Sequence, residues 1–126
     1  MKKIIAAFAI AFASSAAVAQ SAPVIGDWSK TDVTLEAAVA TVAFLDYKQT
    51  LQIKNRPGLS ESNPLLGHHP NDARIRNYFV GSMVAHVLIT NALPPGALRS
   101  AFQAGTIIFE ADIIRQNKRM GLRIKF

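Results

Sequence analysis

Four polar side chains within long apolar segments are the leading candidates for chemistry in this chain: Asp46, Gln49, His86 and Glu110. Imidazole and carboxylate groups can bind a divalent metal ion, and they can relay a proton near neutral pH. They can also hydrogen-bond one another and do no more than fix how helices pack. The chain has no H-E-x-x-H or similar helical motif, so no motif supports the metal role over the other two. All three roles stay open.

A second candidate site lies in the long segment 58–70 and consists of Glu61, Asn63 and His69. The spacing of Pro and Gly in this segment predicts several fixed turns, and therefore an ordered loop. Glu61 and Asn63 could simply hydrogen-bond the backbone of their own loop. Alternatively, Glu61 and the histidines could line a site at the cytoplasmic mouth of the protein.

Polar residues recur at helical spacing in two of the segments that must position these side chains. One segment carries Tyr78, Ser82, His86 and Thr90, and the other carries Arg99, Gln103, Thr106, Glu110 and Asn117. In a water-soluble bundle such stripes are the wet outer faces of the helices. In a membrane they must face the bundle interior or a water-filled cavity, and Asp46, His86 and Glu110 would then converge.

The predicted fold is all-α: a three-helix bundle with one long ordered loop, forming a single domain over residues 20–126. The helices are expected at about 32–54, 72–93 and 95–118. Thr31 or Asp32 suits the first N-cap, and Asn71 or Asp72 suits the second. Pro95 fits the first turn of the third helix, and Gly121 fits just beyond its end.

Small residues four positions apart, Gly81 and Ala85, allow two helix backbones to approach closely. The Ala-rich first helix is the expected partner. We therefore predict a close contact between the first and second helices at Gly81.

Residues 1–19 have the pattern of a secretory signal peptide. Lys2 and Lys3 precede the uncharged run 4–13, and Ala17-Val18-Ala19 resembles a cleavage site. An uncleaved anchor is the alternative, because the apolar run is only slightly too short to span a bilayer. The chain has no cysteine, so neither a disulfide framework nor a lipoprotein anchor is available.

Two basic clusters alternate with weakly charged segments, as the positive-inside bias produces in small membrane proteins. One cluster lies between Lys48 and Arg76, and the other between Arg115 and Lys125. Three membrane-spanning helices would place both clusters on the cytoplasmic side of the bacterial inner membrane, facing anionic lipid headgroups. A soluble bundle in the periplasm is the alternative. Nucleic acid is not an expected partner of an exported chain, whereas a protein partner or a homo-oligomer stays open.

A motif in the middle of the chain resembles one found in small bacterial and phage helical membrane proteins of unknown function. It reads D-x-x-Q-T from Asp46, then E-x-N-P-x-L-G from Glu61. The resemblance implies a helical membrane protein and carries no activity or catalytic residue with it.

Three functions are therefore compatible with the sequence. The first is a small integral inner-membrane protein of structural or accessory role. The second is a membrane-embedded metal or proton site, or an enzyme, that uses Asp46, His86 and Glu110. No cofactor is predicted for it, and a divalent metal stays open. The third is a soluble periplasmic helical binding module. No catalytic residue is assigned, because no nucleophile or cofactor fingerprint occurs in a recognisable setting.

Overall fold

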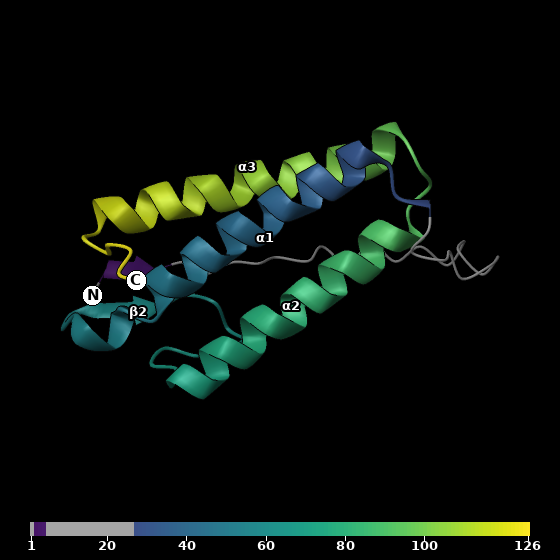
Figure 1. Cartoon of the computed structure of the whole chain (residues 1–126). Helices are drawn as coiled ribbons and strands as arrows, with labels where there is room; N and C mark the ends of the chain where they lie inside the picture. The colour runs from purple at the N-terminus through teal and green to yellow at the C-terminus, as the bar shows by residue number, and fades with distance from the viewer. Residues whose placement is uncertain (1, 5–26) are drawn as a thin grey trace.

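The computed structural model describes residues 2–4 and 27–126, which form three long helices, a short 3-10 helix and a two-stranded sheet. The helices are α1 (Lys30–Thr50), α2 (Asp72–Ala92) and α3 (Ala97–Arg119). The prediction of three helices in a mostly helical chain is confirmed. α1 packs chiefly against α3 and less extensively against α2, which runs obliquely beneath α1 (Figure 1).

Local capping chemistry sets where α1 and α2 begin. Ser29, rather than the predicted Thr31 or Asp32, is the N-cap of α1, and its side chain accepts from the backbone N–H of Asp32 at 3.1 Å. Asp32 accepts in return from the backbone N–H of Ser29 at 2.8 Å, which completes a capping box. Asn71 caps α2 as expected, accepting from the backbone N–H of Arg74 at 2.8 Å.

Two helix boundaries differ from the predicted ones. α1 ends at Thr50 instead of about residue 54, and a 3-10 helix, η2 (Ile53–Asn55), follows it. α3 begins at Ala97 because Gly96 has φ 110°, a left-handed backbone that breaks the helix and leaves Pro95 outside its first turn. The end of α3 is as predicted, with Gly121 at φ 92°.

The segment predicted as an ordered loop contains a short strand, β2 (Leu59–Glu61). It pairs in parallel with β1 (Lys2–Ile4), with Lys2 opposite Leu59 and Ile4 opposite Glu61. Apart from β1, the predicted signal peptide lies outside the described residues.

Polar and apolar residues are distributed unusually between the interior and the surface of the bundle. The buried face of α1 follows the alternating spacing of three and four that normally carries a hydrophobic seam, yet it includes Asp32, Glu36 and Asp46. Many apolar side chains lie outside instead: Val33, Phe44, Val80, Val84, Leu88, Leu98, Ile108 and Phe109. The bundle is therefore polar within and largely apolar on its helical surface.

The apolar core is confined to small clusters. One joins Ile53, Leu59 and Leu122 beneath the end of α3, a second joins Leu66, Ile75 and Phe79, and a third consists of Val39 and Ala43. Across the described ranges 2–4 and 27–126, no helix combines the length and the apolar character needed to cross a membrane.

The predicted close contact at Gly81 is wrong. Gly81 is exposed, and a Cβ atom placed there would meet nothing within 4 Å. Gly81 lies outside the buried face of α2, which carries Phe79, Ser82 and His86.

Candidate functional site in the bundle interior

The buried polar residues form two groups at different levels of the bundle. We call one the paired cluster: Asp32, Glu36, His86, Thr90, Arg99, Gln103 and Thr106. We call the other the oxygen-rich cluster: Asp46, Gln49, Thr50, Glu61, Glu110 and Asn117. All of these residues are buried except Thr106, which is half-buried. The residues of these two clusters that lie on α2 and α3 belong to the polar stripes seen in the sequence, and they face the interior of the bundle.

His86 and Glu36 form the centre of the paired cluster. The His86 ring lies with Nδ1 2.7 Å from Oε1 of Glu36 and Nε2 3.1 Å from the Thr106 hydroxyl. The ring also stacks on Phe102, with 4.6 Å between ring centroids. Glu36 accepts further hydrogen bonds from Gln103 at 2.9 Å and from Thr90 at 3.4 Å. Glu36 thus connects residues of all three helices and is held on several sides.

Arg99 and Asp32 form the end of the same cluster. The Arg99 guanidinium is 1% exposed and lies 3.3 Å from the Asp32 carboxylate. It also donates to the backbone carbonyl of Leu93, at 2.7 Å and 3.2 Å, and thereby satisfies a carbonyl at the C-terminal end of α2. A buried charge pair is tolerated only with such additional hydrogen bonds.

The oxygen-rich cluster has many acceptors and few donors. Asn117 donates to Asp46 at 3.0 Å, while the side-chain amide of Gln49 donates to the carbonyls of Ile114 and Leu122. The carboxyls of Asp46 and Glu110 lie close enough for their charges to interact. Several buried oxygens have no hydrogen-bond partner within the described part of the chain: Asp46 Oδ2, Gln49 Oε1, Thr50 Oγ1, Asn117 Oδ1 and both oxygens of Glu110. Buried polar atoms of this kind are costly and demand an explanation.

The structure divides the four residues predicted to converge. Asp46, Gln49 and Glu110 belong to the oxygen-rich cluster, whereas His86 belongs to the paired cluster. Glu36 and Asp46 are ten residues apart on α1, or about 15 Å along its axis. Val39 and Ala43 occupy the buried face between them and pack against Tyr78, Met83 and Ile107. His86 is inside the bundle as expected, but its partners differ from those predicted.

The predicted loop site is also divided. Glu61 is buried, accepts from the backbone N–H of Asn63 at 2.7 Å, and lies near enough to Asp46 for their charges to interact. Asn63 accepts from the backbone N–H of Leu65 at 2.9 Å, which is the structural role considered for it. His69 is exposed. The loop therefore contributes Glu61 to the interior rather than forming a separate site with His69.

Glu36 is the residue that sequence reasoning missed. Glu36 was not among the candidate residues, yet it lies four residues after Asp32 and ten before Asp46. Together with Val39 and Ala43, these residues follow one helical face. That spacing was the available evidence that Glu36 points inward with the other polar residues.

In residues 2–4 and 27–126, no three or more histidine or acidic side chains are grouped so that they could hold a metal ion. Comparison with known protein families, with curated proteins and with solved structures found no match.

Proposed function

We propose that this chain is a small integral protein of the bacterial inner membrane, with a structural or accessory role and a polar interior that specifies how its helices pack. The observation that carries the proposal is the placement of buried charges and exposed apolar side chains. Val84 is 55% exposed, Leu88 64% and Ile108 71%, while Glu110 is fully buried. Hydrocarbon would solvate such a surface, and polar groups facing it would be unsatisfied.

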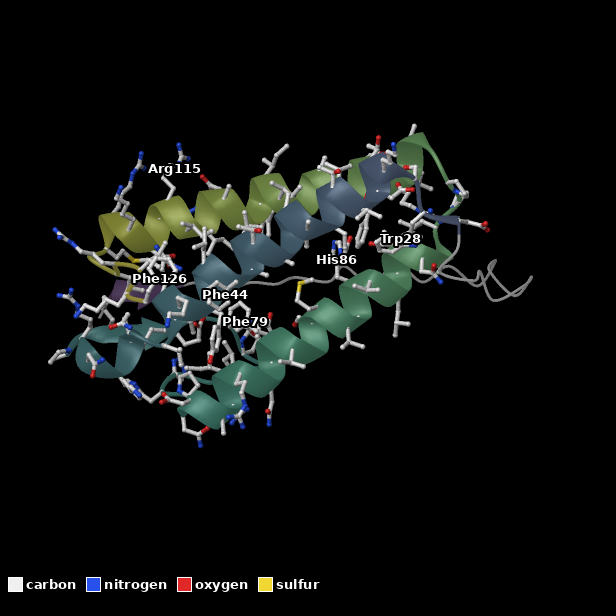
Figure 2. The ribbon with its side chains drawn as sticks, viewed as in Figure 1. Trp28, Phe44, Phe79, His86, Arg115 and Phe126 are labelled. Carbon is white, nitrogen blue, oxygen red and sulfur yellow. The ribbon has the colours of Figure 1, made fainter. Side chains whose placement is uncertain are left out.

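The distribution of basic residues supports the same proposal. α1 ends, α2 begins and α3 ends on one side of the molecule, so both basic clusters lie there (Figure 1). Arg115 extends outward on that side in Figure 2. Trp28 lies at the other end of the bundle, where its indole N–H donates to Asn91 at 3.1 Å. Basic residues gathered on one side and an aromatic residue at the opposite end match the two interfaces of a membrane protein.

Cysteine accessibility tests this proposal directly, because the chain has no cysteine of its own. We expect Val84→Cys to resist a water-soluble maleimide in isolated membranes and to react after denaturation in detergent. A thiol in hydrocarbon meets neither water nor the reagent, and it does not form the reactive thiolate. The measurement is the labelled fraction over time by gel mobility or mass.

Asn55→Cys is the matched control, since Asn55 is exposed in η2 outside the three long helices. It should react in both conditions once both membrane faces are open to the reagent. Equal labelling of Val84→Cys and Asn55→Cys in membranes would contradict the proposal and favour a water-soluble periplasmic module. Release of the wild-type chain from membranes by alkaline carbonate would likewise contradict the proposal.

The oxygen-rich cluster favours one further candidate function, a proton-binding site. We infer that the carboxyls of Asp46 and Glu110 bind exchangeable protons, because protonation removes two buried negative charges that lie close enough to repel each other. The acidic groups of this proton-binding site come from three elements: Asp46 lies on α1, Glu61 on β2 and Glu110 on α3. The titratable residue that α2 places in the interior is His86, and it contacts Glu36 in the paired cluster. Buried carboxyls inside membrane helices commonly serve proton pathways.

Infrared spectroscopy of reconstituted protein tests the proton-binding site. We expect a band from protonated carboxyl groups in the wild type that exchanges in heavy water and weakens in Glu110→Gln. Asp112→Asn, a change at a partly exposed residue of the same helix, should leave the band unchanged. A spectrum in which Glu110→Gln and the wild type show the same carboxyl band would exclude the site.

A further inference from the structure

An apolar groove runs along the outer surface between α1 and α2. It has a volume of about 400 Å³ and is lined by alanine, valine, methionine and aromatic side chains, including Ala40, Phe44, Tyr47, Phe79 and Met83. Figure 2 shows Phe44 and Phe79 in the space between the two helices. A neighbouring hollow continues it along α2 from Met83 and Val84 to Val87 and Leu88.

Among the described residues that line the groove, one is charged: Arg76, near the N-terminal end of α2. The Arg76 side chain makes no hydrogen bond or ion pair with any other described residue. Two other basic residues of the same cluster, Lys54 and Arg74, are already engaged. Lys54 pairs with Asp72 at 2.6 Å, and Arg74 donates to the carbonyl of Leu65. An exposed, unpaired guanidinium at the end of an apolar groove is complementary to an anionic group attached to an apolar chain.

The dimensions fit one leaflet of a bilayer. From Arg76 to Leu88 is twelve residues, or about 18 Å along the helix. Half of the hydrocarbon core is about 15 Å thick. The groove and the hollow that continues it therefore start at the basic end of the bundle, where headgroups would lie, and together extend about as far as one acyl chain reaches.

We propose that this groove binds a single anionic phospholipid, with its phosphate on Arg76 and one acyl chain against Phe44, Phe79 and Val84. The proposal rests on the membrane location proposed above. A second copy of the chain is a poorer occupant, because each copy would have to place an acidic group against the Arg76 side chain of the other. The acidic residues of the described helices are mostly buried or, like Asp72 and Asp112, already paired.

Lipid retention measures the proposed binding. The chain is purified in mild detergent, supplied with an equimolar mixture of phosphatidylglycerol and phosphatidylcholine, and analysed by native mass spectrometry. We expect one molecule of phosphatidylglycerol on the wild type, and about tenfold lower retention on Arg76→Gln, as the loss of a charge-assisted hydrogen bond predicts. Arg119→Gln, an exposed arginine at the same end of the bundle and outside the groove, should match the wild type.

Filling the groove gives an independent test. Ala40 is exposed and lines the groove, whereas Ala37 is exposed on the same helix outside it. Ala40→Trp should abolish retention, and Ala37→Trp should preserve it. Equal retention by wild type and Arg76→Gln, or a wild-type dimer that Ala40→Trp converts to monomer without bound lipid, would overturn the inference.

The same samples separate this inference from the membrane proposal. Flotation with lipid vesicles reports whether the chain enters a bilayer at all. A chain that floats but shows no preference for phosphatidylglycerol disproves the lipid site alone. A chain that stays at the bottom of the gradient disproves the membrane location and the lipid site together.

Discussion

Replacing Arg99 with methionine is expected to cost about 3–5 kcal/mol in the free energy of unfolding, because it leaves the Asp32 carboxylate buried without its counter-charge. The same substitution removes the donors that satisfy the carbonyl of Leu93. Methionine replaces the apolar stem of the arginine and lacks the guanidinium group, so the loss would come mainly from charge and hydrogen bonding. Denaturant titration of the purified protein, followed by circular dichroism, measures the effect.

Two variants show whether the loss arises from the pair. Asp32→Asn in the Arg99→Met background removes the unpaired charge and keeps an oxygen to accept from the Ser29 backbone N–H, so it should restore the part of the stability that was lost through the charge. Arg115→Met breaks the exposed Arg115–Asp112 pair on the same helix and should change stability little. A double variant no more stable than Arg99→Met would mean that the charge pair is not the source of the effect.

Replacing Glu36 with leucine is expected to cost about 3 kcal/mol or more, because it removes a buried carboxylate to which three side chains bond. Those partners are His86, Gln103 and Thr90, which all bond to the Glu36 carboxylate. A leucine side chain fills nearly the same volume as that of glutamate, so lost hydrogen bonds would account for most of the loss of stability. Thermal unfolding in the detergent used for purification gives the comparison.

The matched substitution in the other cluster is Glu110→Leu, and its predicted effect is different. Neither oxygen of Glu110 has a hydrogen-bond partner in the described structure, so removing the carboxyl breaks no bond. We expect the variant to be as stable as the wild type or more stable, since apolar replacement of buried polar groups is often neutral or stabilising. A loss as large as that of Glu36→Leu would show that Glu110 supports the fold.

The helices were predictable because strong local breakers surround them. Pro57 and Gly58 follow the first, and Pro94, Pro95 and Gly96 separate the second from the third. The start of α1 was missed because Ser29 and Asp32 act as a reciprocal pair, and each alone is an ordinary capping residue. β2 was missed because its partner is β1, more than fifty residues away, and three residues carry no periodicity.

The composition of the interior was predictable in part. The stripes on α2 and α3 have regular spacing, so their inward faces could be predicted once a membrane was considered. The partner of His86 could not, because it depends on the rotation of α1 about its axis. That rotation is set by the packing of Val39 and Ala43 against α2 and α3, which requires coordinates.

The principal contact of the bundle is between its first and last helices, and this dictates an order of assembly. α1 packs most extensively against α3, whose residues Gln103 and Asn117 bond to Asp32, Glu36 and Asp46 of α1. The Glu36 and Asp46 carboxylates of α1 therefore stay without these donors until α3 has been synthesised. A chain truncated before Ala97 should accordingly be degraded by proteases faster than the intact chain.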